Sequence, residues 1–151
     1  MAAMHPPMAT LRLYADTLDP ALITSILSVK PDLAAKAGEG LAERADRTRV
    51  PAKTGTWYIT TRRHVSESDP AKHLFWVLRL VAPKFDALKE AVPSLRASFS
   101  LLVHDGGFEA KSLPAGLLAD VLSIGDLEIE VPERAMDIVL DSGNAGQYLV
   151  P

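Results

Sequence analysis

Hydrophobic and polar residues alternate along four segments of the chain, and a period of two residues is typical of a strand with one buried face. The four segments are 10–16, 56–62, 96–104 and 126–131. The last is the clearest, because Leu127, Ile129 and Val131 alternate there with acidic residues. A weaker strand is predicted at 47–50, paired with segment 56–62 through a turn.

Periods close to 3.6 residues predict helices between these strands. Asp19 and Asp69 each precede a proline, and each pair is predicted to begin a helix. The aspartate carboxylate can accept hydrogen bonds from the N–H groups of the first turn. Proline has no N–H group, but at the first helical position an N–H group would have no partner within the helix. The second of these helices carries an apolar stripe: Leu74, Val77, Leu78 and Val81. Further helices are predicted at 84–92 and at 114–124, the latter closed by Gly125.

Three large apolar residues lie off the stripe of the helix that follows Asp69: Phe75, Trp76 and Leu80. A helix that is apolar on more than one side is either deeply buried or shared with a partner. A small two-layer domain leaves little room for burial on all sides. We therefore expect a partner surface here, and its simplest occupant is a second copy of the chain.

The predicted element order is β-α-β-β-α-β-α-β. Strands with one wet face argue against a doubly wound parallel sheet, whose strands are apolar on both faces. We predict an α+β fold: a two-layer, ferredoxin-like, mostly antiparallel or mixed sheet with helices on one face, plus a C-terminal helix–strand extension. We expect one domain over residues 10–132, a disordered lead at 1–9, and a tail at 133–151 that frays or docks on a partner.

Composition narrows the class of protein. The chain has no cysteine, which excludes disulfides and cysteine-based chemistry and agrees with a cytoplasmic location. No apolar run approaches the ~20 residues that span a bilayer, so no membrane contact is expected. The net charge of −3 argues against general binding of nucleic acid. Basic residues gather over 44–63 and acidic ones over 105–141, a pattern that more often reflects solvated faces or complementary halves than a ligand site.

The familiar nucleotide and catalytic motifs are missing. The two glycines of segment 38–40 do not form a dinucleotide fingerprint, since Glu43 stands where the third glycine belongs, and they are interpreted as a turn. His64, His73 and His104 lack the close spacing of a metal site. Ordinary surface or edge histidines are the default interpretation, and neither a metal nor a cofactor is expected.

Four stretches together resemble a known family. They are DTLDPALITSILSVKPD from Asp16, KAGEG from Lys36, TGTW from Thr54 and HLFWVLRL from His73. In combination they resemble an uncharacterised bacterial family, domain of unknown function 4279, over about residues 10–131. The resemblance implies no reaction and therefore assigns no catalytic residue.

Two surfaces are candidates for binding. The first is the wet face of the sheet, whose candidate residues are Arg12, Tyr14, Tyr58 and Arg62. Tyrosine beside arginine on an open sheet can stack bases, but the acidic last strand would repel phosphate. A self-complementary dimer face is favoured, with a hydrated face without a partner as the alternative. The second surface is the off-stripe patch of Phe75, Trp76 and Leu80.

These observations favour a non-enzymatic binding or protein-interaction module that is cytoplasmic and homodimeric. The alternative is a small hydrolase-like enzyme that uses His64 or His104 with nearby carboxylates. This alternative requires a concave pocket in which one of the two histidines meets a carboxylate within hydrogen-bond reach.

Overall fold

The computed structural model describes residues 6–38 and 54–132. Its elements are β1 (Met8–Ala15), α1 (Pro20–Leu27), β2 (Leu33–Ala35), β3 (Gly55–Thr60), α2 (Pro70–Val81), the 3-10 turn η1 (Ala82–Lys84), α3 (Phe85–Ala91), β4 (Arg96–Leu102), the 3-10 turn η2 (Ala110–Ser112), α4 (Ala115–Ile124) and β5 (Asp126–Glu130). The strand predicted at 47–50 and the tail at 133–151 lie outside the described residues. β1 begins at Met8, slightly before the boundary predicted for the domain.

The strands form one five-stranded mixed sheet in the order β2-β3-β1-β4-β5. The central strand β1 runs antiparallel to both of its neighbours, so that Arg12 is opposite Tyr58 on one side and Ser98 on the other. β5 is parallel to β4, because α4 carries the chain back along the sheet before β5 begins. The predicted α+β class and the mixed sheet are confirmed.

β2 is a strand that the hydrophobic pattern did not predict. It has three residues, too few to show a period of its own. Its position is set by hydrogen bonding to β3: Ala34 pairs with Trp57, and the N–H of Asp32 donates to the carbonyl of Tyr58 at 2.8 Å. The carboxylate of Asp32 also accepts from the N–H of Thr60 at 2.6 Å. Pairing with β3 therefore defines this edge strand.

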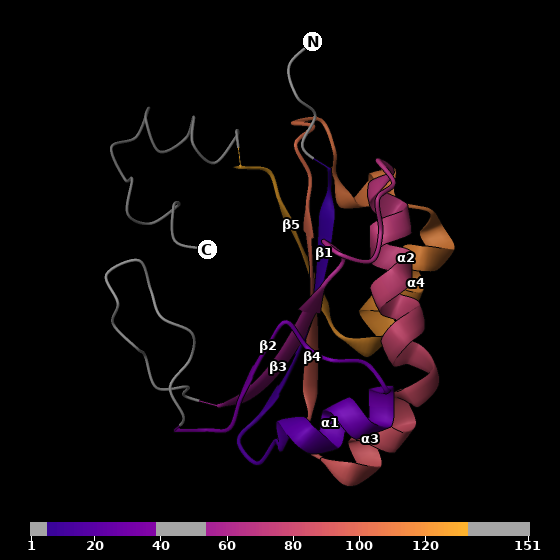
Figure 1. Ribbon diagram of the computed structural model, residues 1–151. Coiled ribbons are helices and arrows are strands. Elements are labelled where there is room, and N and C mark those ends of the chain that lie inside the picture. Colours follow the sequence, from indigo (N-terminus) through magenta and orange to yellow (C-terminus); the bar gives the residue numbers. More distant parts are fainter. Residues whose placement is uncertain (1–5, 39–53, 133–151) are drawn as a thin grey trace, which may run out of the picture.

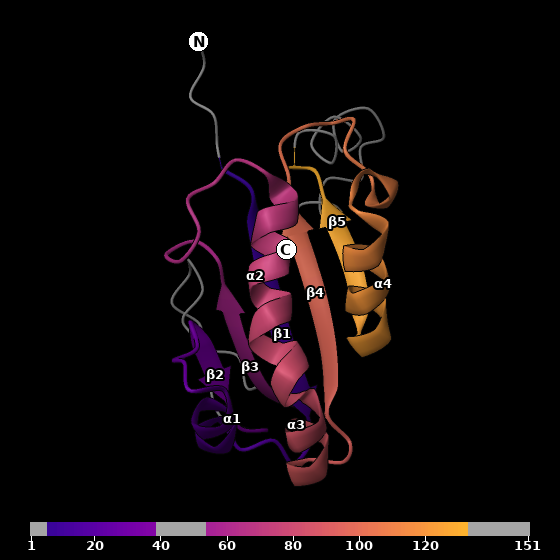
Figure 2. The same ribbon diagram turned by 90° about the vertical axis from the view of Figure 1, so that its right-hand side faces the viewer.

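The helices α1 to α4 cover one face of the sheet (Figure 1). Seen from that side, α2 passes in front of the central strands and α4 lies over β5 (Figure 2). The other face is free of helices within the described residues. The molecule therefore offers two different surfaces, the outer side of the helices and the polar face of the sheet.

The core fills the space between the sheet and these helices, and the predicted alternation identifies its residues. The following strand residues point into it and are buried: Leu11, Leu13, Trp57, Ile59, Phe99 and Leu101. The indole N–H of Trp57 donates to Thr24 Oγ1 at 3.0 Å, which satisfies the one polar atom of this fully buried side chain and ties α1 to β3.

Both predicted aspartate caps are present. Asp19 Oδ1 accepts from the N–H of Ala21 at 3.1 Å, and Asp69 Oδ1 accepts from the N–H of Ala71 at 3.0 Å. In α2 the predicted apolar stripe is buried as a whole: Leu74, Val77, Leu78 and Val81. The cap fixes where the helix begins, and the stripe fixes its rotation against the sheet.

Gly125 ends α4, but not in the left-handed conformation that usually selects glycine at a helix end. Its backbone is extended, with φ −166° and ψ −171°. A Cβ at this position would lie 2.1 Å from the carbonyl oxygen of Ala97 in β4. Glycine is required here because two backbones approach each other closely where the chain enters β5.

We expect Gly125→Ala to lower the free energy of unfolding by about 2–3 kcal/mol, because the new methyl group must displace the β4 backbone. Gly116→Ala in the same helix is the control. An added Cβ at Gly116 meets nothing within 4 Å, so this change should be neutral or stabilising by up to about 1 kcal/mol. Urea unfolding measures both, and equal stabilities for the two variants would contradict the close approach.

Candidate functional site

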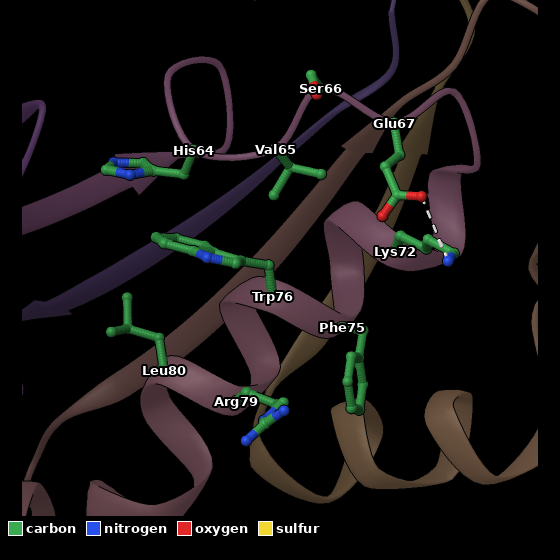
Figure 3. Close-up of a pocket in the computed structure, with 9 residues that line it drawn as sticks. All are labelled: His64, Val65, Ser66, Glu67, Lys72, Phe75, Trp76, Arg79 and Leu80. Carbon is green, nitrogen blue, oxygen red and sulfur yellow. Dashed lines mark ion pairs between the residues drawn. The ribbon is translucent and has the colours of Figure 1, made fainter.

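A cavity lies beside α2, where the helix meets the loop that leaves β3 (Figure 3). Its volume is about 920 Å³. We call it the α2 groove, and it is lined by His64, Val65, Ser66, Glu67, Lys72, Phe75, Trp76, Arg79 and Leu80. Two walls therefore come from separate elements, the helix on one side and the loop on the other.

An aromatic platform forms the centre of the groove. The rings of His64 and Trp76 are stacked, with their centroids 4.6 Å apart and their planes 13° from parallel. Trp76 is half-buried, whereas Phe75 is 48% exposed and has the guanidinium of Arg79 over its ring at 5.5 Å. Exposed aromatic residues beside an arginine are typical of surfaces that bind another molecule.

The charges of the groove are biased toward positive. Glu67 pairs with Lys72 at 3.3 Å, and both side chains are more than half exposed, so the pair itself contributes at most about 1 kcal/mol. Arg79 has no such carboxylate partner among the described residues. Its neighbour in the groove is the Phe75 ring. Arg79 therefore remains available to an anionic group.

His73 corrects the default interpretation of the histidines, because it is not a surface residue but 1% exposed. Its Nε2 donates to the carbonyl of Glu67 at 2.6 Å, and its Nδ1 lies 2.7 Å from Thr61 Oγ1. Thr61 Oγ1 in turn accepts from the N–H of Ala9 at 3.0 Å. A carbonyl only accepts, so Nε2 of His73 is the donor in its bond to Glu67.

The contacts of His73 hold the loop wall of the groove in place. The loop also bonds to itself, since the N–H groups of His64 and Val65 both donate to the carbonyl of Thr61. His73 then connects Glu67, at the far end of the loop, to Thr61 at its start. The sequence contained a signal that His73 is buried: it precedes Val77 by one helical turn and therefore lies on the same, buried side of α2.

The other two histidines lie in different places. His64 is exposed at the α2 groove, and His104 lines a second cavity of about 350 Å³ together with Arg62 and Val65. Within residues 6–38 and 54–132, no group of three or more His, Asp or Glu side chains is placed to hold a metal ion. Among the same residues, no helix has both the length and the apolar character to cross a lipid bilayer.

The polar face of the sheet carries the other predicted binding residues. Arg12 lies over the ring of Tyr14 at 4.7 Å, and its Nε donates to Thr56 Oγ1 at 3.3 Å. Tyr58 is opposite Arg12 on β3. Arg62 follows the end of β3 and lines a cavity of about 410 Å³ that also contains Tyr58.

The predicted residues therefore fall into two sets on opposite sides of the sheet (Figure 1). Phe75, Trp76 and Leu80 line the α2 groove, while Arg12 and its neighbours lie on the face without helices. Sequence reasoning missed the charged rim of the groove, although Lys72 and Arg79 share its face of α2 by helical spacing. It also missed the loop residues Ser66 and Glu67, which have no periodic pattern.

We expect His73→Leu to lower the free energy of unfolding by about 2–4 kcal/mol, because it leaves the Thr61 hydroxyl and the Glu67 carbonyl without their buried partner. The control is His64→Leu, which removes an exposed ring and should change stability by less than about 0.5 kcal/mol. Urea unfolding compares the two variants. A similar loss for both would show that the buried contacts of His73 contribute nothing of their own.

Comparison with curated proteins and with solved structures finds no match. A family model does match residues 4–127, which is most of the chain, and this confirms the resemblance seen in the sequence. The chain belongs to the family described as a domain of unknown function, DUF4279.

Proposed function

We propose that this protein is a non-enzymatic binding module that takes a segment of another protein into the α2 groove. The observation that carries this proposal is the aromatic platform, in which a half-buried Trp76 stacks on His64 between exposed Phe75 and a loop held by His73. Tryptophan and arginine are both enriched among the residues that contribute most of the binding energy at protein interfaces.

The contents of the groove favour binding over hydrolysis. A hydrolase-like mechanism through His64 needs a carboxylate that orients or activates its ring. In the groove the ring of His64 stacks on Trp76, and the carboxylate of Glu67 pairs with Lys72. The polar groups are thus engaged in contacts that shape the groove, and the surfaces left open are aromatic, aliphatic and cationic.

The same contacts define the class of ligand. Trp76, Phe75 and Leu80 can contact an apolar or aromatic side chain, and Arg79 at the rim can donate a charge-assisted hydrogen bond to a carboxylate. The best fit is a peptide segment in which an apolar anchor stands close to an aspartate or glutamate. We place this interaction in the cytoplasm, in keeping with a chain that contains no cysteine.

The architecture is consistent with a scaffold for binding. The first four strands occur in the order β2-β3-β1-β4 with antiparallel pairing throughout, and helices follow β1 and β3. On this basis we propose a ferredoxin-like unit with α4 and β5 as its extension. In such a unit α2 lies on the outer surface, and the loop before that helix determines the shape of the groove.

Selection from a random-peptide display library on the immobilised protein tests this function. We expect the selected peptides to combine an apolar or aromatic residue with an acidic one. Calorimetry with a selected synthetic peptide should then show a loss of about 10-fold or more in affinity for Trp76→Ala and for Arg79→Glu, because these changes remove the platform and the cation.

Leu122→Ala serves as the control for this experiment. Leu122 is 55% exposed on α4 and does not line the groove, so its replacement should leave the affinity unchanged. The proposal fails if no peptide sequence is enriched, or if Trp76→Ala binds the selected peptide as well as Leu122→Ala does.

A further inference from the structure

The polar face of the sheet carries one row of residues whose charge changes from positive to negative. Arg12 on β1 is opposite Ser98 on β4, and Ser98 is opposite Asp126 on β5. The three residues therefore lie side by side. Leu11 and Phe99, next to Arg12 and Ser98 in their strands, are buried in the core, so the row lies on the sheet face that the helices of Figure 1 leave uncovered. Adjacent strands are about 4.8 Å apart, so Arg12 and Asp126 flank Ser98 at nearly equal distances.

The two charged ends of this row lack an ionic partner within the described part of the chain. Arg12 is exposed and contacts Tyr14 and Thr56, neither of which neutralises it. Asp126 is exposed at the start of β5. Ion pairs among the described residues are found elsewhere, as between Glu67 and Lys72. Among the described residues nothing neutralises Arg12 or Asp126, and each can pair with a charge on another molecule.

We propose that a second copy of this chain packs against this face, related by a two-fold axis that runs parallel to the strands and passes over β4. This rotation stacks the two β4 strands and exchanges the strands on either side of them. Arg12 of one copy then faces Asp126 of the other, and symmetry forms the same pair a second time. The surface is on the opposite side of the sheet from the α2 groove, so the dimer is independent of the function proposed above.

The residues at the proposed axis allow the two sheets to approach. Ser98 and Ser100 are the polar-face residues in the middle of β4, and both are small enough for a sheet spacing of about 10 Å. Arg12 and Asp126 lie about 5 Å from the axis, so a packing angle of about 30° displaces them by only about 2.5 Å. Arg96, at the start of β4, leans away from the axis over the Tyr14 ring at 5.9 Å.

Other placements of a second copy bring like charges together. An axis over β1 would stack Arg12 on its own counterpart. Antiparallel pairing of two β5 edges would set the acidic side chains of Asp126, Glu128 and Glu130 against one another, which is destabilising. Of these three arrangements, the axis over β4 alone pairs opposite charges.

Three strands of each sheet, β1, β4 and β5, overlap in this arrangement. Contact between three strands of each sheet buries less surface than the roughly 1,600 Å² of a standard protein–protein interface, so we expect a weak and reversible dimer. Its dissociation constant should lie in the range of about 10–100 µM, which sedimentation over a concentration series can measure.

Two charge-reversal variants test the pairing, Arg12→Asp and Asp126→Arg. Each variant alone places like charges opposite each other at both pairs, so each should sediment as a monomer, with association weakened by about 10-fold or more. An equimolar mixture restores both pairs, because one chain supplies Asp at both positions and the other supplies Arg at both. The mixture should therefore form a heterodimer with about the affinity of the unaltered protein.

Circular dichroism and thermal melting confirm that each variant is folded before it is mixed. The proposal is overturned if the unaltered chain stays monomeric up to about 500 µM, if either variant alone dimerises like the unaltered chain, or if the mixture remains monomeric. Trp76→Ala should dimerise normally, since the α2 groove lies on the other side of the sheet. Loss of peptide binding and loss of dimerisation can therefore be told apart.

Discussion

The face of the sheet on which each side chain lies is the constraint on which the rest of this structure depends. In the central strand β1, Leu11 and Leu13 are fully buried while Arg12 between them is exposed. Side chains alternate strictly along a strand, so a slip of one residue against β3 or β4 would bury Arg12 and expose both leucines. Burial of an unpaired guanidinium is far more costly than any gain from the slipped register, which leaves one alignment of the sheet.

Helix α2 transmits this constraint to the molecular surface. Its apolar stripe packs on the buried face of the sheet, and that contact sets the rotation of the helix about its own axis. Phe75 is then exposed and Trp76 lies half-buried at the edge of the core, because both are off the stripe. His73 lies on the buried side of the same helix, and its two ring nitrogens form hydrogen bonds with Thr61 and with the carbonyl of Glu67. The helix therefore both exposes one wall of the groove and anchors the other.

Burial on one side also separates the two candidate surfaces. The α2 groove has aromatic and cationic character and belongs to the helical layer, whereas the polar face of the sheet carries a row of opposite charges. Within residues 6–38 and 54–132, no side chain contributes to both of them. Binding at one surface can therefore change without altering the other, as the two proposals require.

The sequence by itself determined which residues enter the core, where helices begin, and which large apolar residues of α2 stay outside. Periodicity and the Asp19 and Asp69 caps are local properties, so they can be read without knowledge of the fold. Pairing with distant residues decided the rest: β2 is a strand because β3 lies beside it, and Gly125 is required by the backbone of Ala97. His73 became a buried connector only when α2 packed beside Thr61 at the end of β3. Arg12 and Asp126 came into one row only when β1, β4 and β5 aligned. Helical spacing indicated that His73 is buried, but the strand pairings and the contact at Gly125 join residues far apart in the chain, and no local pattern records them.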